Sequence, residues 1–408
     1  MNPLNYCLEQ TELKESKVFR DAIHNYIYVD QPLILELIDT PEMQRLKRIK
    51  QLGGVHQVYQ SAEHSRFTHS LGVYHVVLKM INDTILKDVL SDYDKLTVMC
   101  AALLHDIGHG PFSHCFEEVF KSSHEEYTIR IINGHSQVHQ VLESFHQGFS
   151  KQVSSIITKE HSNKILVQMV SSQLDCDRMD YLLRDSHFTG TIYGHFDMAR
   201  ILRVLRVYDG KIVFKESGVQ AIENYILARY HMYWQVYYHP MGRSYEQILM
   251  SIFKRIKDLY LQGFDLGDIR YLVPFINGNV SEADYLKLDE SIILYYFTVF
   301  KESKDPILAD LCDRFLNRRL FNYCDLVDAD DIEVIKKRCI KLGYDPKYYV
   351  LFDDQSQIPY FISHDELSEI EILVNGKLRF LPEVSEIVGA IIKAKKNKDD
   401  QKIFYPEG

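Results

Sequence analysis

Long apolar runs are absent from this sequence, and so is a leader segment. No stretch of roughly 18 or more consecutive apolar residues occurs, so we expect no membrane-spanning helix. Residues 1–16 are polar and acidic and lack the apolar centre of a signal peptide. The sequence therefore predicts a cytoplasmic protein that neither enters nor crosses a membrane.

Cysteine motifs are missing as well. The seven cysteines are scattered, odd in number and without a CxxC pair. This usage predicts reduced thiols, and it argues against a disulfide framework or a zinc ribbon. Cys115 and Cys176 lie beside the motifs described below, but neither spacing requires a metal ligand.

An excess of positive charge is the third absence. The net charge of -10 argues against non-specific binding to nucleic acid or to a membrane surface, although a local basic pocket remains compatible with it. Internal repeats and low-complexity tracts are also lacking. The 408 residues are enough for one large domain with a smaller appendage.

What is present is a cluster of histidines at the end of a predicted helix. Val98–Leu104 is apolar and rich in helix formers, whereas the glycines and proline of Gly108–Pro111 cannot extend a helix comfortably. The break holds His105, Asp106, His109 and His114. Imidazole and carboxylate groups together suit a divalent metal ion better than they suit a core.

Further metal ligands must come from other segments. Neighbouring residues on a helix point about 100° apart, so His105 and Asp106 alone cannot surround an ion. Two stretches offer the remaining ligands, His64–Gly72 and Asp175–Asp185. The order His, His-Asp, Asp resembles the signature of the HD phosphohydrolase superfamily. The proposed metal set is His69, His105, Asp106 and Asp177, which leaves positions open for water and a phosphate oxygen.

Other polar residues near these ligands are candidates for catalysis. Among the histidines, His109, His114 and His124 could donate a proton to a leaving oxygen, and Glu117 could hold a histidine in the working tautomer. For these histidines, the alternative is that one or more of them simply caps the metal site. For the metal set, the alternative is hydrogen bonding among buried polar residues. His64 fits a ligand and a structural residue equally.

Arginines and tyrosines beside the motifs fit a phosphorylated ligand. Arg66 and Arg178 adjoin proposed ligands, and Arg229 could complete a phosphate clamp because guanidinium matches phosphate oxygens. Salt bridges to nearby acids are the alternative. Three tyrosines could stack on a base, and the alternative is that they pack in the core: Tyr181, Tyr233 and Tyr237.

The sequence pattern predicts a mostly α fold, with an HD-domain helical core, short β-hairpins and a small α+β C-terminal piece. We divide it into an N-terminal segment 1–16, a core with a helical extension 17–335 and a C-terminal region 336–408. A short strand or hairpin is predicted at Val18–Val29, a hairpin at Val207–Phe214, and strands at Tyr348–Phe352, Ile370–Val374 and Lys377–Phe380. Helices are predicted from Asp39–Glu42 through Lys50, and over Leu71–Ile85, Val219–His239, Ser244–Tyr260, Ala283–Phe300 and Asp310–Phe321. Lys393–Asp400 is predicted to be a solvated helix end or a tail.

The chain resembles one branch of the superfamily, the deoxynucleoside triphosphate (dNTP) triphosphohydrolases. The matching stretches are DTPEMQRLKRIKQLGG (39–54), HSRFTHSLGV (64–73), LLHDIGHGPFSH (103–114), SHEEYT (123–128), DCDRMDYLLRD (175–185), WQVYYHP (234–240) and LNRRLF (316–321). The resemblance covers roughly residues 17–322, and residues 1–16 leave no room for a SAM domain, so we expect the bacterial form. It implies a tetramer that hydrolyses a dNTP to the deoxynucleoside and inorganic tripolyphosphate, with a divalent ion of undetermined identity (Mn, Mg, Fe, Zn or Ni).

The resemblance also assigns roles to matching positions. It implies catalysis by His124 with His114 and Glu117, phosphate contacts by Arg66, His109, Arg178 and Arg229, a sugar pocket of Gln51, Leu52, Tyr181, Asp185 and Tyr237, and His239 near the base. For an activating guanine nucleotide, dGTP or GTP, between subunits it implies Asp39, Gln44 and Lys47 with Lys17, Val18 and Arg318 beside them.

Several positions depart from the eukaryotic pattern. Arg178 stands for a lysine and Glu117 for an aspartate, which preserves the charge, whereas Lys47 stands for an arginine and Asn322 for a lysine. The changes at Lys47 and Asn322 leave open which nucleotide is the activator and whether one is required. For Asp39, a helix N-cap is the alternative role. The alternatives for the whole chain are another HD activity, such as a phosphodiesterase or an alarmone hydrolase, or a nucleotide-binding regulator.

Overall fold

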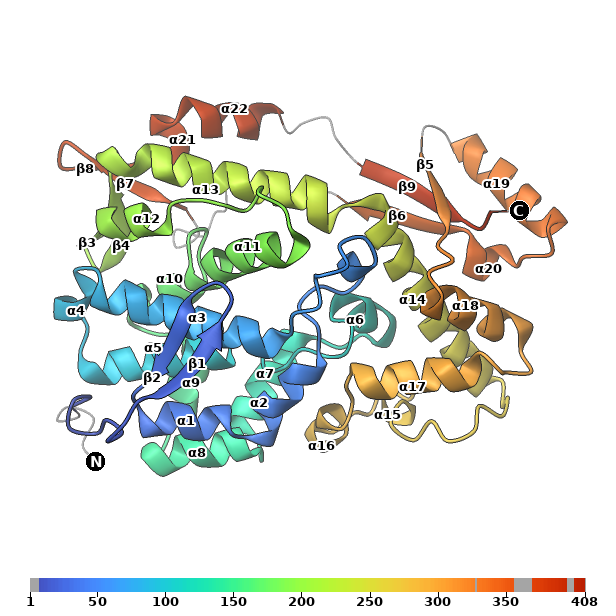
Figure 1. The fold of residues 1–408 in the computed structure, drawn as a ribbon, viewed down its shortest axis with the longest axis horizontal. Coiled ribbons are helices and arrows are strands. Elements are labelled where there is room, and N and C mark those ends of the chain that lie inside the picture. Colours follow the sequence, from blue (N-terminus) through green and yellow to red (C-terminus); the bar gives the residue numbers. More distant parts are fainter. Residues whose placement is uncertain (1–6, 327–328, 356–368, 395–399, 408) are drawn as a thin grey trace.

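The computed structural model describes residues 7–326, 329–355, 369–394 and 400–407. It is mostly helical, as the sequence predicts (Figure 1). The helices are α1 Pro32–Ile38, α2 Pro41–Arg45, α3 Arg66–Asn82, α4 Leu86–Val89, α5 Asp92–Leu104, α6 His114–Phe120, α7 His124–Asn133, α8 Gln137–Phe145, α9 Phe149–Ile157, α10 Lys164–Val170, α11 Cys176–Thr189, α12 Met198–Val204, α13 Val219–Met232, α14 Pro240–Leu261, α15 Val273–Ile276, α16 Glu282–Leu286, α17 Glu290–Phe300, α18 Pro306–Leu316, α19 Ala329–Lys341, α20 Pro346–Tyr349, α21 Leu381–Val384 and α22 Glu386–Ala394. Shorter 3-10 turns lie at Leu46–Arg48, Val55–Gln57 and Glu216–Gly218, and a π-helical turn lies at Tyr233–Tyr237.

Short strands form small sheets around the helices. They are β1 Lys17–Asp21, β2 Asn25–Val29, β3 Leu205–Tyr208, β4 Lys211–Lys215, β5 Asn322–Asp325, β6 Leu351–Gln355, β7 Glu371–Val374, β8 Lys377–Phe380 and β9 Asp400–Tyr405. The sheets have the orders β1-β2, β3-β4-β7-β8 and β5-β9-β6. The C-terminal region therefore supplies strands to two sheets that begin before residue 336.

Three helices bring the predicted metal ligands together. The helix α3 packs against both α5 and α11 at the centre of the left half of Figure 1. Asp175 is the N-cap of α11, and its side chain accepts the Arg178 N–H at 2.8 Å. Gly72 allows α3 and α11 to approach, because a Cβ there would lie 1.9 Å from Oδ1 of Asp180. The sequence thus needs a glycine one turn after His69.

Two large clusters of buried apolar side chains hold the fold. The first lies around α3, α5, α10, α11 and α13, and the second lies around α14, α17 and α18. The helix α14 spans 22 residues and buries most of one face in the second cluster. At its N-terminal end it also contacts the loop around Gly54, so the two halves of the chain meet near the candidate site.

Predicted hairpins agree with the structure. Val18–Val29 forms β1 and β2, and Val207–Phe214 forms β3 and β4 around the Asp209–Gly210 turn. The strands predicted around the Asn375–Gly376 turn are β7 and β8. In both two-residue turns the two central residues have positive φ, which explains the Asp-Gly and Asn-Gly pairs.

Other predicted boundaries were wrong. The helix expected to run through Lys50 ends at Arg45, and its N-cap is Thr40, while Asp39 ends α1. The helix expected over Val219–His239 changes to a π-helical turn after Met232. Tyr348 and Tyr349 belong to α20, so only residues 351 and 352 of that prediction are in a strand.

Two long predicted helices also differ from the observed ones. Ala283–Phe300 is divided into α16 and α17, because Asp289 caps a new helix by accepting the Ile292 N–H. The helix predicted to end at Phe321 ends at Leu316. The prediction for Lys393–Asp400 falls mainly on residues 395–399, which lie outside the described residues.

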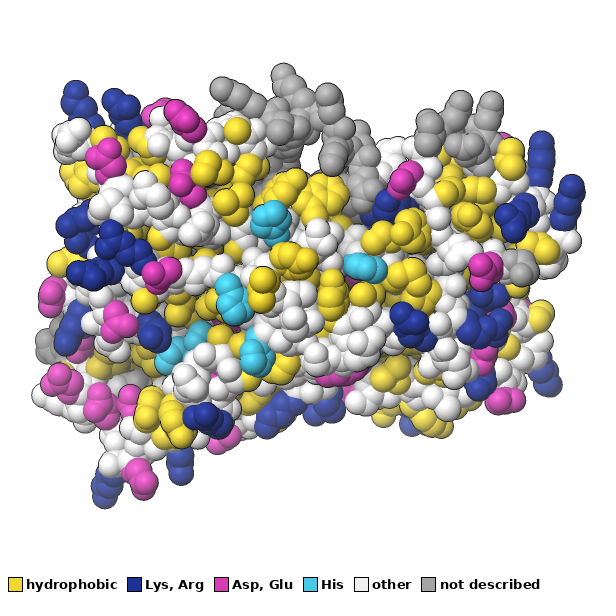
Figure 2. All heavy atoms as spheres, turned by 45° about the horizontal axis from the view of Figure 1, so that its top comes forward, with side chains coloured by type: hydrophobic (Ala, Val, Ile, Leu, Met, Phe, Trp, Pro, Cys, Tyr) yellow, Lys and Arg dark blue, Asp and Glu magenta, His cyan; other side chains and the backbone are white. Residues whose placement is uncertain are grey.

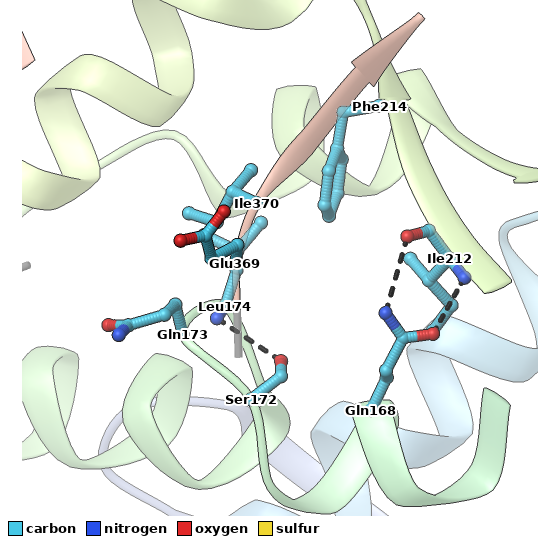
Figure 3. Close-up of a pocket in the computed structure, with 8 residues that line it drawn as sticks. All are labelled: Gln168, Ser172, Gln173, Leu174, Ile212, Phe214, Glu369 and Ile370. Carbon is cyan, nitrogen blue, oxygen red and sulfur yellow. Dashed lines mark hydrogen bonds between the residues drawn. The ribbon is translucent and has the colours of Figure 1, made fainter. Parts of the chain in front are cut away.

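A cavity of about 10 Å³ lies where β7 meets α10 and the segment before α11 (Figure 3). Gln168 spans one side, where its amide accepts the Ile212 N–H at 2.8 Å and donates to the Ile212 carbonyl at 3.5 Å. This volume holds about one water molecule. The cavity is therefore a packing feature that cannot admit a nucleotide.

The surface mixes charges of both signs, with one concentration of basic side chains. Lys and Arg gather at the left of Figure 2, over the region of α12, β3 and β4. The segment from α12 to β4 carries five basic residues within 16 positions: Arg200, Arg203, Arg206, Lys211 and Lys215. Among the described residues, no helix combines the length and apolar character needed to cross a bilayer.

Candidate metal centre and active site

The four predicted metal ligands converge. His69 on α3 places Nε2 3.1 Å from Oδ1 of Asp177 at the start of α11 and 3.9 Å from Oδ2 of Asp106. His105 ends α5, and its Nε2 lies 3.4 Å from Asp106 Oδ1 and 3.6 Å from Asp177 Oδ1. Ligands about 2.1 Å from one ion lie roughly 3 to 4 Å apart, so these separations fit a shared cation.

Hydrogen bonds turn both imidazoles toward this point. The Nδ1–H of His69 donates to Asp180 at 2.8 Å, and that of His105 donates to the Ala102 carbonyl at 2.8 Å. With its hydrogen on Nδ1, each neutral ring could offer the Nε2 lone pair to a metal ion. Nε2 of His105 is buried and has no hydrogen-bond partner among the described residues. The residues present fit a divalent metal ion.

Electrostatics at the centre reflect the concentrated carboxylates. Burial alone lowers the pKa of His69, but hydrogen bonds and charges from Asp177 and Asp180 raise it to about 10 in the metal-free protein. Burial opposes ionisation of Asp106, yet nearby His105, His109 and Arg66 hold its pKa well below the usual range. The carboxylates are therefore ionised at neutral pH, which suits cation binding.

A buried ionic network supports His69 from behind. Asp180 accepts hydrogen bonds from His24 Nε2 at 2.7 Å and from Arg184 Nε at 2.8 Å, and Arg184 also pairs with Asp21 at 2.9 Å. Asp21 and His24 belong to the β1–β2 hairpin. The hairpin is thereby joined to a metal ligand through two side chains. The sequence analysis missed this network, although Asp180 lies one helical turn after Asp177.

A second cluster lies directly beside the metal centre. His109 Nε2 is 3.4 Å from Asp106 Oδ1, and its ring stacks on His124 at 3.9 Å between centroids. Glu117 Oε1 accepts from His124 Nδ1 at 2.9 Å, and Oε2 lies 3.4 Å from Nδ1 of His114, which is exposed. A Cβ on Gly108 would lie 2.2 Å from the His124 carbonyl, so this close approach requires glycine.

The protonation preferences in this cluster differ. Burial, together with the charge of Arg66, lowers the pKa of His109 to about 3, so His109 is neutral at physiological pH. Burial opposes ionisation of Glu117, but hydrogen bonds from His114 and His124 place its pKa well below the usual range. Glu117 is thus an ionised acceptor that orients His124.

Arg66 links the metal centre to a strained loop. Its guanidinium donates to Asp106 Oδ2 at 2.5 Å and to Ser113 Oγ at 2.8 Å. Phe112 and Ser113 both have positive φ, at 56° and 47°. Such strain is common at functional sites. Ser113 is a positioning residue that the sequence analysis did not identify.

Arg178 on α11 and Arg229 on α13 lie near each other. Arg178 is paired with Asp175, and Arg229 Nη1 donates to the Gln173 side chain at 2.8 Å. The Nε–H groups of both arginines are buried and without a partner among the described residues. Burial opposes the charge on Arg178, but Asp175 keeps its pKa well above the usual value. Two positively charged side chains, each with an unused hydrogen-bond donor, fit an anionic ligand.

The residues that the resemblance places on a sugar also lie together. Asp185 Oδ2 accepts the Tyr237 hydroxyl at 2.7 Å, and Asp185 Oδ1 accepts from His64 Nε2 at 2.8 Å. The Tyr181 ring is 6.3 Å from the Tyr237 ring, and the Gln51 N–H donates to the His64 carbonyl at 3.0 Å. His64 is therefore bonded to Asp185 and is not one of the converging metal ligands.

The remaining predicted residues occupy separate places. Leu52 is buried beside Gln51, and His239 caps α14 by accepting the Met241 N–H at 3.3 Å. Gln44 donates to the Ile38 carbonyl and accepts from Lys47 at 2.7 Å, so it lies beside Asp39. The others lie on β1 and just after α18: Lys17, Val18 and Arg318. Arg318 donates to the Gln57 carbonyl at 2.8 Å.

Unpartnered polar atoms are concentrated at this site. Among the described residues, 16 buried polar side-chain atoms lack a hydrogen-bond partner, and six of them belong to the residues discussed above. They are Gln51 Oε1, His64 Nδ1, His105 Nε2, His109 Nδ1, Arg178 Nε and Arg229 Nε. Buried polar atoms are normally paired, so this concentration indicates a ligand site.

Family models match the part of the chain that contains these residues. The HD domain model matches residues 66–185, and the HD associated region model matches residues 196–264. The uncharacterized protein YwfO of Bacillus subtilis is 45% identical over 407 residues, with 97% of this chain and 93% of that protein covered. Human deoxynucleoside triphosphate triphosphohydrolase SAMHD1 is 29% identical over 362 residues, which cover 78% of this chain and 56% of that protein.

Solved structures share the whole fold. A crystal structure of a phosphohydrolase from Bacteroides thetaiotaomicron superposes with a TM-score of 0.86 at 30% identity, covering 96% of this chain and all of that one. A hypothetical protein from Aquifex aeolicus superposes with a TM-score of 0.74 at 29% identity, covering 96% and 97%. The HD ligand geometry therefore occurs within an architecture that other solved proteins share.

Proposed function

Because this chain belongs to the HD-domain family of phosphohydrolases, we propose that it hydrolyses dNTPs to the deoxynucleoside and inorganic tripolyphosphate. The observation that carries the proposal is the set of buried, unpartnered polar atoms on His105, His109, Arg178 and Arg229. Those atoms match what a metal ion and a polyphosphate would contact. The similarity to the human triphosphohydrolase supports the choice of dNTP, although the chain spans about half of that protein.

A divalent ion would be held by His69, His105, Asp106 and Asp177, and it would polarise the phosphoryl group and lower the pKa of bound water. The identity of the ion is open among Mn, Mg, Fe, Zn and Ni. Asp180 and the Ala102 carbonyl keep the two imidazoles turned toward that position. The binding site is thus oriented by the protein before a ligand arrives.

The leaving group requires a proton. Attack by water at the α-phosphorus breaks the bond to the 5′-oxygen, and the departing deoxynucleoside takes up one proton there. His124 is the proposed donor, because Glu117 holds its Nδ1 at 2.9 Å and leaves Nε2 available for transfer. His114 lies 5.6 Å away between ring centroids and would assist from the exposed side.

Positive groups would neutralise the triphosphate. Arg66, Arg178 and Arg229 are the proposed phosphate contacts, and His109 would contribute a neutral imidazole between the phosphates and His124. Gln51, Leu52, Tyr181, Asp185 and Tyr237 would enclose the sugar, and His239 would lie near the base. A close fit there would exclude a 2′-hydroxyl.

A guanine nucleotide, dGTP or GTP, is the proposed activator. Asp39, Gln44 and Lys47 form one group on α1, α2 and the turn that follows, while Lys17 and Val18 lie on β1. Arg318 lies after α18 and contacts the Val55–Gln57 turn instead. A second subunit would bring such separated residues together, and we propose a homotetramer. We propose a cytoplasmic location for this assembly.

Product analysis tests the proposal. Each dNTP is incubated with the purified protein and manganese or magnesium, alone and then with dGTP or GTP. Deoxynucleoside plus tripolyphosphate is the expected product pair, and it should disappear in Asp106→Ala. Dependence on the added nucleotide would support the activator.

Other products would overturn the proposal. Release of orthophosphate or pyrophosphate, or equal hydrolysis of ribonucleotides and cyclic dinucleotides, would indicate a different HD activity. Stable nucleotide binding without turnover under any metal would indicate a regulator.

A further inference from the structure

The carboxylate of Asp185 is held on both sides. It lies on α11, two helical turns after Asp177, and its side chain is almost completely buried. One oxygen accepts from His64 and the other from Tyr237, at 2.8 and 2.7 Å. Each carboxylate oxygen accepts about two hydrogen bonds, so each retains one acceptor site for a ligand hydroxyl.

His64 makes this bond and no other polar side-chain contact among the described residues. Its Nδ1 is buried and unpartnered, so the Nε2–H tautomer donates to Asp185. The ring stacks on Phe188 with centroids 4.6 Å apart and an interplanar angle of 17°. Phe188 is on the same helix as Asp185, so His64 is fixed both in its plane and in its hydrogen bond.

The main chain of His64 is bonded to the segment that contains Gln51. Its carbonyl accepts the Gln51 N–H at 3.0 Å, and Lys50 and Ser65 form a β-bridge beside it. The amide oxygen of Gln51 is buried and unpartnered. His64 therefore connects the segment of Gln51 to the helix of Asp185. Its two hydrogen bonds set the distance between the Gln51 amide oxygen and the Asp185 carboxylate, both of which can still accept hydrogen bonds.

We propose that His64 is a positioning residue that determines sugar specificity, because it holds the Asp185 carboxylate at a fixed place opposite Gln51. This inference rests on the proposed function. The sugar of a dNTP has one free hydroxyl, the 3′-hydroxyl, so that group is the donor that Asp185 would accept. Tyr237 completes the arrangement, since burial and the neighbouring Asp185 raise its pKa well above the ordinary value and keep its hydroxyl protonated.

The test compares 2′-deoxy and 2′,3′-dideoxy nucleoside triphosphates. In the wild-type protein kcat/KM should favour the 2′-deoxy substrate. His64→Leu should lower this ratio about tenfold, mainly through KM, because the Asp185 carboxylate loses its bond to His64 and no longer points at the 3′-hydroxyl. His64→Gln should restore most of the ratio, since its amide N–H replaces the Nε2–H. Tyr237→Phe, which removes the other bond to Asp185, should move the ratio in the same direction.

Controls separate positioning from general damage. His187→Leu carries the same substitution at an exposed position on α11 and should leave the ratio unchanged. If rates on both substrates fall in parallel in His64→Leu while the ratio stays at the wild-type value, the inference is wrong. Thermal melting of each variant shows whether it is folded. If His64→Leu does not fold, the substrate comparison is made with His64→Gln.

Failure of the proposed function has a different signature. If the wild-type protein releases no tripolyphosphate, that function is wrong, and the same variants are compared for binding of dATP and 2′,3′-dideoxy-ATP by calorimetry. A binding ratio that falls in His64→Leu then supports the role of His64, and an unchanged ratio overturns it. Absence of any dATP binding by the wild-type protein would overturn both proposals.

Discussion

His69 Nδ1 lies 2.8 Å from Asp180 Oδ2, and both side chains are completely buried. This hydrogen bond fixes the tautomer that turns His69 Nε2 toward Asp106 and Asp177. Asp180 also contacts His24 and Arg184, so one carboxylate joins the β1–β2 hairpin to a metal ligand. The orientation of His69 thus depends on residues that are distant in sequence.

Asp180→Asn should weaken metal binding by about 10- to 100-fold, because the amide cannot accept the same set of donors and orients His69 less firmly. Titration with manganese, followed by measurement of bound metal, gives the affinity. Asp88→Asn, at an exposed position on α4, is the matched control. An unchanged affinity in a folded Asp180→Asn protein would contradict this role.

His124→Gln should lower kcat by about 10²- to 10⁴-fold with little change in nucleotide affinity, because the proton donor is lost while the phosphate contacts remain. Glu117→Gln should lower kcat less, since it removes only the acceptor that orients His124. Steady-state kinetics and calorimetric binding together check both effects. His135→Gln, exposed before α8, should behave as wild type, and a drop in affinity equal to the drop in kcat would argue against an acid role.

Gly72→Ala should destabilise the fold by about 1–3 kcal/mol and weaken metal binding as well. The added Cβ would lie 1.9 Å from Asp180 Oδ1 and 2.4 Å from Arg184 Nη2, so α3 and α11 must move apart. Chemical denaturation measures the loss. Gly242→Ala on α14 is the control, because its nearest atom would be 3.9 Å away, and it should keep or slightly raise stability. Equal stability of the two variants would exclude a tight contact at Gly72.

Glu246 should make stability depend on pH. Burial raises its pKa to about 7, while the Gly54 N–H donates to Oε1 at 3.4 Å. A carboxyl whose pKa is higher in the folded state contributes to folding stability when it is protonated. That contribution is complete below the unfolded pKa of about 4.3, and it is lost as the pH rises through about 7. Wild type should therefore lose on the order of 2 kcal/mol relative to Glu246→Gln between pH 5 and pH 8. Denaturation curves of both proteins at both pH values measure this difference. If wild type and Glu246→Gln differ in unfolding free energy by the same amount at pH 5 and pH 8, Glu246 does not cause the pH dependence.

Much of the candidate site could be predicted from local patterns. His105 and Asp106 follow an apolar helix that glycines end, and α5 ends at Leu104 as expected. Asp175 is followed by a helix whose first turn carries Asp177. Ligand types, helix ends and the order of the segments are properties of short stretches, so the sequence indicates them directly.

Contacts between distant segments could not be predicted in the same way. His24 and Asp180 are 156 residues apart, and His64 and Asp185 are 121 apart. Their pairing depends on the approach of α3 to α11 and on the path of the β1–β2 hairpin. The π-helical turn that positions Tyr237 also lies within a stretch whose pattern predicts a regular helix.

The mostly α class, the hairpins with Asp-Gly and Asn-Gly turns, and the histidines and carboxylates of the candidate metal centre could all be read from the sequence. These features follow from residue type and short spacing, which local backbone energetics decide. Which side chains support the candidate site became clear from the packing of the fold: Asp180 bonds to His69, Ser113 to Arg66, and His64 to Asp185. The physical reason is that such bonds exist only after packing has removed water and brought separate helices within hydrogen-bond distance.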